Sequence, residues 1–306
     1  MGISLQENKL CSLEQATELI KDSAMVVVGG VLTAREPNAI IRQIIKDKRK
    51  DIHVVAGAHN FAIDLMCAGQ VVSICENSFV GYEFDLGLAL NYRRACEQKK
   101  VVVKETDCNI LLQQLRAAQF GVPFMPMPKL GGTDIVGIHK EYMQLDCPYT
   151  GKPITLVPAL KPDVAIIHAH YADKKGNVKI LGPVFKDKLF AQVANTVIVS
   201  VEEIVSEEKM HELGPTIMYY NTDAIVEIPF GAHPSACYPN YTYDRQHMKL
   251  FTKQSKNDEM IGQYLQNYVD NVKDNDEYLE LIGGAEKMQF LKSWQQDKKQ
   301  WMEAFQ

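Results

Sequence analysis

The sequence has no apolar run long enough to span a membrane, and its opening stretch, MGISLQENKLCSLEQATELIKDS, lacks the charged-then-apolar order of a signal peptide. It also has little excess of either charge, because 33 Lys and Arg residues against 38 Asp and Glu residues give a net charge of −5. No stretch is strongly basic, as a surface for nucleic acids or anionic lipids would require. We therefore expect a cytoplasmic protein that binds neither nucleic acid nor membrane.

Paired cysteines are absent as well. The seven cysteines are scattered and none forms a CxxC pair: Cys11, Cys67, Cys75, Cys96, Cys108, Cys147 and Cys237. An odd, scattered set in a chain without a signal peptide argues against a disulfide framework. We expect reduced thiols that act mainly as small buried apolar side chains.

The glycine-rich loops that hold nucleotides are missing too. The stretch MVVVGGVLTAREP (25–37) lacks the third glycine of GxGxxG, and the next strand ends at 53–57 without a carboxylate for a ribose. No GxxxxGK[ST] run occurs. What remains is a tight turn at the carboxyl edge of a sheet, either a plain strand-to-helix turn or a turn whose N–H groups meet a ligand. On the residues alone the plain turn is favoured.

Alternating strands and helices make up the first part of the chain. Apolar runs predict strands at 24–28, 51–56, 71–75, 100–104, 195–201 and 224–228. Helical spacing predicts helices at 13–21, capped by Ser12, and at 36–46, 62–68 and 109–120. This alternation predicts an α/β fold with an open, largely parallel sheet and helices on both faces.

The middle and the end of the sequence differ from this pattern. Residues 121–135 contain three prolines and three glycines, which predicts an extended excursion over the surface or a site. Residues 163–180 predict a hairpin that turns at 174–177. After Tyr243 the sequence becomes charged and helix-forming, and one side of a terminal helix carries residues expected to pack: Met288, Leu291, Trp294, Trp301 and Phe305. We expect one domain over 1–306, with an α/β core at 1–243 and a helical extension at 244–306.

Five sequence blocks resemble a known family. They are GGVLTAREP (29–37), AAQFGVPFMP (117–126), DVAIIHAHYADKKGNV (163–178), VEEIV (201–205) and DAIVEIPFGAHPSACY (223–238), and KDNDEYLELIGG (273–284) follows the same pattern. From residue 24 to about residue 283 the chain resembles the α subunits of the class I CoA transferases, most of all the glutaconate type. The two long blocks are specific, whereas the glycine pair alone is weak.

The resemblance implies a reaction and a partner. CoA transferases of this class move CoA between carboxylic acids through a glutamyl-CoA thioester, with a homologous β subunit in an αβ or α2β2 assembly. The CoA thioester is then a substrate, and no tightly bound cofactor is implied. The turn at Gly29, Gly30 and Val31 would recognise the acyl or CoA group and supply oxyanion donors. Val31 stands where the family commonly has an aromatic residue, which could alter the acyl pocket.

Three residues are candidates for catalysis or substrate binding. Glu76 precedes an asparagine, as the nucleophile of the β chain typically does, but the expected position ends the strand at 57–60, where no carboxylate occurs. The resemblance therefore places the nucleophile on the partner, with Glu76 as the weaker alternative. Ser78 resembles a contact for the far carboxylate of the acid, and a cap or turn role is equally open. Arg35 could hold a carboxylate or a CoA phosphate, or be a solvated residue at a helix start.

The histidines are expected to be structural. His168 and His170 alternate along one strand, and with Asp173 as the one further ligand nearby a metal site is improbable. His170 stands where close relatives have glutamine, which leaves its role open. Residues 233–235 (His-Pro-Ser) would shape the subunit interface or the mouth of the site, and Cys237 beside them shows no sign of activation.

Two other functions stay open from the sequence. One is a ring-opening hydrolase acting on a cyclic ketone CoA thioester, which would use a carboxylate of this chain: Glu83, Glu105 or Asp107. The other is a non-catalytic ligand-binding module. The acid, the CoA donor and the stoichiometry of the assembly do not follow from the sequence.

Overall fold

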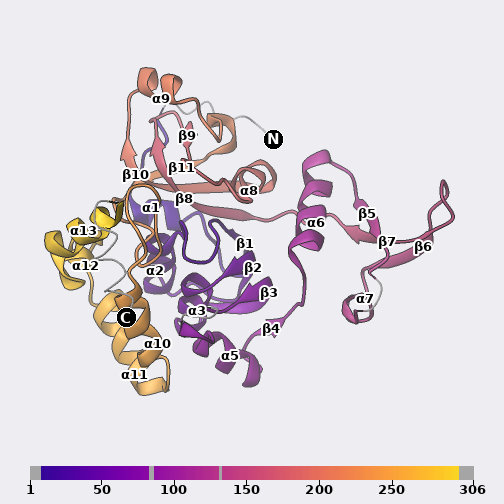
Figure 1. Cartoon of the computed structure of the whole chain (residues 1–306), viewed down its shortest axis with the longest axis horizontal. Coiled ribbons are helices and arrows are strands. Elements are labelled where there is room, and N and C mark those ends of the chain that lie inside the picture. Colours follow the sequence, from indigo (N-terminus) through magenta and orange to yellow (C-terminus); the bar gives the residue numbers. More distant parts are fainter. Residues whose placement is uncertain (1–7, 83–85, 131–132, 296–306) are drawn as a thin grey trace.

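A computed structural model describes residues 8–82, 86–130 and 133–295 (Figure 1). Its strands are β1 (Met25–Val28), β2 (Ile52–His59), β3 (Val72–Val80), β4 (Val102–Val103), β5 (Phe124–Pro128), β6 (Met143–Asp146), β7 (Pro153–Pro158), β8 (Val164–Ala172), β9 (Val178–Lys179), β10 (Thr196–Ile204) and β11 (Ala224–Glu227). Its α-helices are α1 (Leu13–Thr17), α2 (Asn38–Lys46), α3 (Phe61–Ala68), α5 (Leu90–Glu97), α6 (Cys108–Phe120), α7 (Ile135–Ile138), α8 (Asp187–Val193), α9 (Glu207–Leu213), α10 (Arg245–Gln254), α11 (Asp258–Leu265), α12 (Asn275–Leu281) and α13 (Gly284–Lys292). Short segments of other helix types are η1 (Tyr219–Asn221), η2 (Gln266–Asp270) and η3 (Ser293–Gln295).

The main sheet has eight strands, seven of them in the order β11-β10-β8-β1-β2-β3-β4. All neighbours along this path run parallel, and β9 pairs antiparallel with β8 to close the predicted hairpin. The predicted parallel sheet is confirmed. Several bounds differ: β2 and β3 continue to His59 and Val80, well past the apolar runs, because the two strands stay paired along their length.

Two apolar layers enclose this sheet. Val26, Val28 and Val54 belong to a core shared with α2, α3 and α5, whereas Val27 and Val55 belong to a core shared with α6 and α8. Successive strand residues point to opposite faces, so both faces of β1 and β2 are buried. Helices therefore cover both faces, as predicted.

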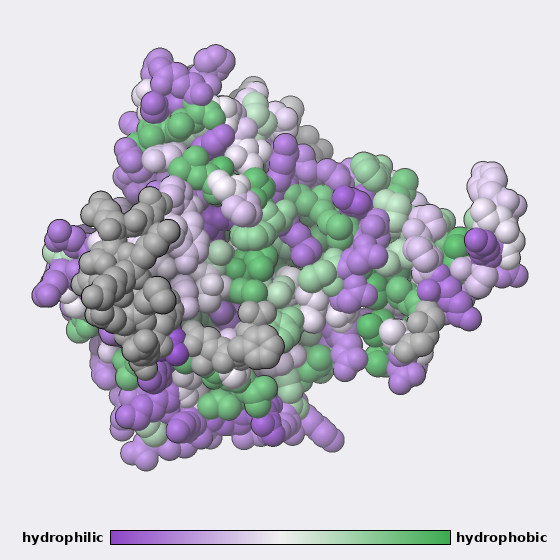
Figure 2. All heavy atoms as spheres, viewed as in Figure 1, coloured by the Kyte–Doolittle hydropathy of each residue, from purple (hydrophilic) through white to green (hydrophobic). Residues whose placement is uncertain are grey.

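A projecting arm follows the main sheet at β4. It begins with α6, which itself packs on the main sheet, and continues with α7 and a three-stranded antiparallel sheet in the order β5-β7-β6 (Figure 1). The sequence pattern predicted only an extended excursion here, and β5 occupies part of it. Pro126 and Pro128 lie on β5, which is an edge strand of this sheet. Proline has no backbone N–H group, and its absence disrupts strand pairing least at an edge. Large apolar side chains remain exposed on the arm, among them Phe120, Phe124 and Met143. Figure 2 shows hydrophobic residues, in green, on the surface of this part of the molecule.

The C-terminal region is helical and packs on the body of the chain. Met288 and Leu291 of α13 are buried against Phe230 and Tyr241, with Trp294 beside them. The predicted packing of these three residues is confirmed, whereas Trp301 and Phe305 lie outside the described residues. The division of the chain at residue 243 stays a prediction. Among the helices that the structure describes, none is both long and apolar enough to cross a membrane.

Candidate functional site

The glycine turn lies at the carboxyl edge of β1, in the middle of the sheet. Gly30 has φ of +78°, and a Cβ at this position would lie 2.5 Å from the carbonyl oxygen of Ala34. Glycine is therefore required for both conformation and space. The turn packs against the loop around Ala236, whose carbonyl accepts from the N–H of Arg35 at 2.7 Å.

The N–H groups of this turn already have acceptors within the chain. Gly29 donates to the carbonyl of Ile166 and Val31 to that of Ala34, both at 2.9 Å. Gly30 donates to Oδ1 of Asp187, also at 2.9 Å. Recognition of an acyl or CoA group by Gly29, Gly30 and Val31 stays a prediction, because these groups would have to exchange their present acceptors to serve as oxyanion donors.

Arg35 is buried, with 3% of its surface exposed, so the interpretation as a solvated residue is wrong. Its guanidinium forms an ion pair of 2.5 Å with Asp187, which is fully buried, and donates to the carbonyls of His168 and Pro183. A substrate role for Arg35 stays a prediction, and its charge is already matched. Asp187 was missed because an acidic residue in the first turn of a helix looks like an ordinary helix start.

Glu36 is a second residue that the sequence did not single out. It precedes α2, which begins at Asn38 and not at Glu36 as predicted. Its fully buried carboxylate accepts from His59 Nδ1 at 3.1 Å and from the N–H groups of Asn60 and Ala62 at 3.2 Å. Glu36 therefore fastens the end of β2 and the start of α3 to the glycine turn.

Glu76 and Ser78 lie inside β3, not at a strand end. Oε2 of Glu76 lies 3.1 Å from His53 Nε2 and 3.9 Å from Lys104 Nζ, and the carboxylate is buried. This pairing disfavours Glu76 as a nucleophile, which needs a free carboxylate. Ser78 Oγ lies 3.0 Å from the sulfur of Cys108, at the start of α6.

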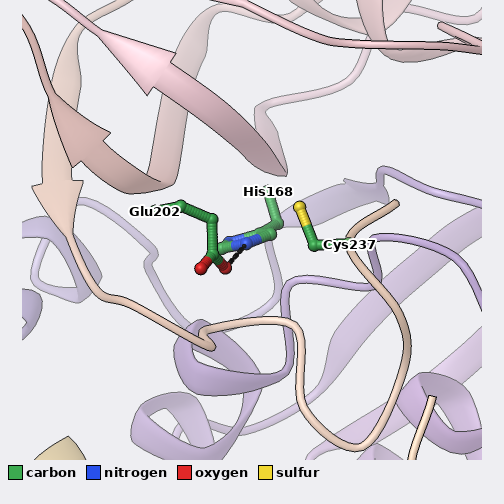
Figure 3. Close-up of side chains that lie close together, drawn as sticks. All are labelled: His168, Glu202 and Cys237. Atoms are coloured by element: carbon green, nitrogen blue, oxygen red, sulfur yellow. Dashed lines mark hydrogen bonds and ion pairs between the residues drawn. The ribbon is translucent and has the colours of Figure 1, made fainter. Parts of the chain in front are cut away.

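His168 belongs to a cluster of three potential metal ligands, together with Glu202 and Cys237. Its ring lies between the carboxylate of Glu202 and the sulfur of Cys237, with ligand atoms within 4.8 Å of one another (Figure 3). The sequence pattern did not indicate either of these two as a ligand, and Asp173 instead accepts from two backbone N–H groups of the hairpin turn. Burial raises the pKa of the Cys237 thiol well above its usual value, so the thiol is protonated.

His168 and Glu202 have hydrogen-bond partners within the chain. His168 pairs through Nδ1 with Ser200 at 2.9 Å and through Nε2 with Glu202 at 2.7 Å. Glu202 also accepts from Tyr241 at 2.8 Å and from the N–H of Phe230 at 3.0 Å. These contacts fit a structural histidine, as predicted. In an unoccupied metal site, the ligand atoms would instead be free of protein hydrogen-bond partners.

His170 is also held by backbone groups. Its Nδ1 accepts from Leu181 at 3.1 Å, and its Nε2 lies 2.6 Å from the carbonyl of Tyr238. Burial lowers the pKa of His170 to about 4, so the ring is neutral near pH 7. His170 therefore carries a structural contact between β8 and the loop that follows residue 236.

A role of the loop at 233–235 at a subunit interface or site mouth stays a prediction, and its side chains make contacts inside this chain. His233 is fully buried between Tyr278, at 2.8 Å, and Asp244, at 3.2 Å. Ser235 accepts from the N–H of Glu36 at 3.1 Å. The loop joins the C-terminal helices to the glycine turn.

The carboxylates suggested for a hydrolase have other surroundings. Asp107 caps α6 by accepting from the N–H groups of Asn109 and Ile110 at 2.6 and 3.0 Å. Glu105 is exposed, and Glu83 lies outside the described residues. Of the two described carboxylates, neither Glu105 nor Asp107 forms a hydrogen bond with the glycine turn.

Comparison with known proteins identifies the family. Residues 11–228 match the sequence pattern of the family described as Coenzyme A transferase. The chain belongs to the coenzyme A transferase family. A glutaconate CoA-transferase subunit of Acidaminococcus fermentans is 30% identical over 298 residues, which cover 91% of this chain and 93% of that protein. The crystal structure of glutaconate coenzyme A-transferase from the same organism matches with a TM-score of 0.87 and 28% identity, over 93% of this chain and 95% of that one.

A longer relative also matches. An uncharacterized protein of Archaeoglobus fulgidus is 36% identical over 294 residues. The match covers 94% of this chain but 65% of that protein. The α/β sheet and the helical C-terminal region thus belong to the α-subunit fold of the coenzyme A transferase family.

Proposed function

We propose that this chain is the α subunit of a CoA transferase that moves CoA between carboxylic acids of the glutaconate or related dicarboxylate type. The supporting observation is that the carboxyl edge has no free carboxylate among the described residues of the glycine turn and the end of β2. Glu36 is held by three donors and Asp187 by an arginine and an N–H group. A transferase assembled this way takes its nucleophile from a second chain.

In the proposed reaction the partner's glutamate attacks the thioester carbonyl of an acyl-CoA. The carbon–sulfur bond breaks, CoA leaves as the thiolate, and an acyl-glutamyl anhydride forms. The thiolate then attacks the glutamyl carbonyl and releases the first acid, which leaves a glutamyl-CoA thioester for the second acid to resolve. Each step exchanges one activated acyl bond for another, so no ATP is needed.

The residues of this chain would shape the acyl and CoA side of the shared site. The Arg35–Asp187 pair holds the glycine turn and Glu36 holds the end of β2, so this wall of the site is preorganised. The CoA thioester is a substrate, with no tightly bound cofactor in the proposal. Closing the site between two subunits would exclude water from the intermediates.

A homologous β subunit is the proposed partner, in an αβ or α2β2 assembly. The large apolar side chains exposed on the arm, with Phe120 66% and Met143 63% exposed, fit a surface that a partner covers. All seven cysteines are free thiols, which fits the proposed cytoplasmic location. The hydrolase is disfavoured because Asp107 acts as a helix cap.

Co-expression with the product of the adjacent gene tests this proposal. The purified pair would be assayed for CoA transfer from acetyl-CoA or glutaryl-CoA to glutaconate, glutarate and butyrate. We expect acyl exchange without net thioester hydrolysis, lost when the partner's glutamate is changed to alanine. Net hydrolysis with a ring-opened product, or no exchange with any acid, would overturn the transferase proposal.

A further inference from the structure

A cavity of about 340 Å³ lies beside β11, an edge strand of the main sheet. Its walls are residues 11–14 at the start of α1, one face of α2, the end of β11 and residues 268–278 of the C-terminal region. The strands β8 and β10 separate β11 from β1, and the residues that line the cavity include none of the glycine turn, β2 or β3. The cavity is therefore distinct from the proposed transfer site, and it is large enough for a small organic molecule.

Arg42 of α2 lies at the buried side of this cavity. It is 9% exposed, and its guanidinium carbon lies 3.6 Å from the centre of the Tyr278 ring. It donates to the carbonyl of His233 at 3.1 Å and to Oδ1 of Asn275 at 3.2 Å. Both acceptors are uncharged, so the charge of Arg42 is not balanced by them.

Lys46 lies one helical turn further along α2 and also lines the cavity. Its Nζ donates to the carbonyls of Val272 at 2.6 Å and Lys273 at 3.0 Å. Over residues 8–82, 86–130 and 133–295, no carboxylate forms an ion pair with Lys46 or Arg42. Both side chains carry more N–H donors than these contacts use. Two neighbouring cations without a counter-ion, one of them buried, favour the binding of an anion.

The acidic residues that line the cavity do not balance these cations. All four are exposed to solvent: Glu14, Glu227, Asp274 and Asp276. Oε1 of Glu227 accepts from the N–H of Ile204, and Oδ1 of Asp274 caps α12 by accepting from the N–H of Glu277. Exposed carboxylates are hydrated and contribute little to the field at a buried group. The solvent side of the cavity is thus acidic, and its buried side is positive.

Much of the remaining lining is apolar. It includes Leu13, Ala39, Val226, Ile228, Val269 and Val272. We propose that this cavity binds a small organic anion, with its charged group between Arg42 and Lys46 and its apolar body against α2 and β11. A guanidinium and an ammonium both form charge-assisted hydrogen bonds with a carboxylate or a phosphate. The ligand would contact the α/β core and the C-terminal helices at the same time.

The test measures the binding of hexanoate, monohexyl phosphate and the neutral hexanamide to the full-length chain by isothermal titration calorimetry. We expect one or both anions to bind and the amide not to bind. Lys46→Met should weaken anion binding about 10- to 100-fold, the usual loss for a charge-assisted hydrogen bond, and Lys46→Arg should recover part of it. Lys48→Met, at an exposed position just after α2, is the matched control and should bind as the wild type does.

Cys11 provides a local readout, because its partly buried thiol lines the cavity. A bound anion should slow the alkylation of Cys11 by iodoacetamide, measured by peptide mass spectrometry, and should leave that of Cys147 on the arm unchanged. This readout separates the cavity from the transfer site, where a carboxylic acid would also bind. Equal affinity for hexanamide, anion binding that Lys46→Met leaves unchanged, unaltered alkylation of Cys11, or no binding of either anion would overturn the proposal.

Discussion

The carboxylate of Asp187 lies 2.5 Å from the guanidinium of Arg35, in a region where both side chains are buried. The same carboxylate accepts from the N–H of Gly30. One acidic side chain thus ties the turn after β1 to the start of α8. The shape of the proposed acyl-binding wall depends on this contact between residues 152 positions apart.

Removal of Asp187 should destabilise the chain. In Asp187→Ala the charge of Arg35 stays buried without a counter-ion, and such a loss costs about 3–5 kcal/mol of the free energy of unfolding. Urea denaturation would measure the change, with Lys188→Ala as an exposed control expected to stay within about 0.5 kcal/mol of the wild type. The double variant Arg35→Met/Asp187→Leu should lose less than the single one. Equal stability of Asp187→Ala and the control would refute the role of the pair.

Gly30→Ala should also be destabilising. The position has φ of +78°, where a non-glycine residue costs about 1–2 kcal/mol, and the new Cβ would lie 2.5 Å from the Ala34 carbonyl oxygen. We expect a lower urea midpoint and lower transfer activity in the complex. Gly137→Ala is the control, because a Cβ there meets no atom within 4 Å. A midpoint for Gly30→Ala equal to that of the control would show that the turn tolerates a side chain.

The fold could be predicted where sequence pattern and burial agree. Ile40, Ile41, Ile44 and Ile45 recur at helical spacing and are all buried in α2. The ends of β2 and β3 could not be predicted, because β2 continues past its apolar run through Gly57, Ala58 and His59, and β3 continues through the polar residues 76–78. Glu76 stays within β3 because His53, on the neighbouring strand, meets its carboxylate.

The sequence predicted where the glycine turn lies in the sheet, but not which residues contact it. The glycine turn does end a central strand at the carboxyl edge, as the sequence indicated. The partners of Arg35 and Glu36 come from α8 and from the end of β2, and no local pattern announces such contacts. Glu202 is different, since it lies in the block VEEIV directly after the strand predicted at 195–201 and could have been considered beside His168.

The cluster of His168, Glu202 and Cys237 should not bind zinc. Both ring nitrogens are hydrogen-bonded, and the buried thiol would have to lose its proton before it could bind a metal. We expect the same Tm after treatment with EDTA and after addition of one equivalent of Zn²⁺. A rise in Tm with zinc that is lost in Cys237→Ser would instead assign a metal site to this cluster.

Asp64 should make stability depend on pH. Burial raises its pKa to about 7, even though the N–H groups of Asn91 and Tyr92 donate to it at 2.8 Å. Between pH 4 and 7 the folded chain therefore binds more protons at this group than the unfolded chain, so its contribution to the free energy of unfolding falls as pH rises, by up to about 1.4 kcal/mol per pH unit. Asp64→Asn removes this titration and keeps an acceptor oxygen for both N–H groups.

The difference in the free energy of unfolding between Asp64→Asn and the wild type should therefore increase from pH 4 to pH 7 and level off above it. Urea denaturation at a series of pH values measures this difference. The opposite slope from His170, whose pKa is lowered to about 4, is present in both proteins and cancels. The exposed Asp276→Asn control should follow the wild type at every pH. Parallel curves for Asp64→Asn and the wild type would mean that Asp64 stays ionised in the folded chain, with its two N–H donors outweighing its burial.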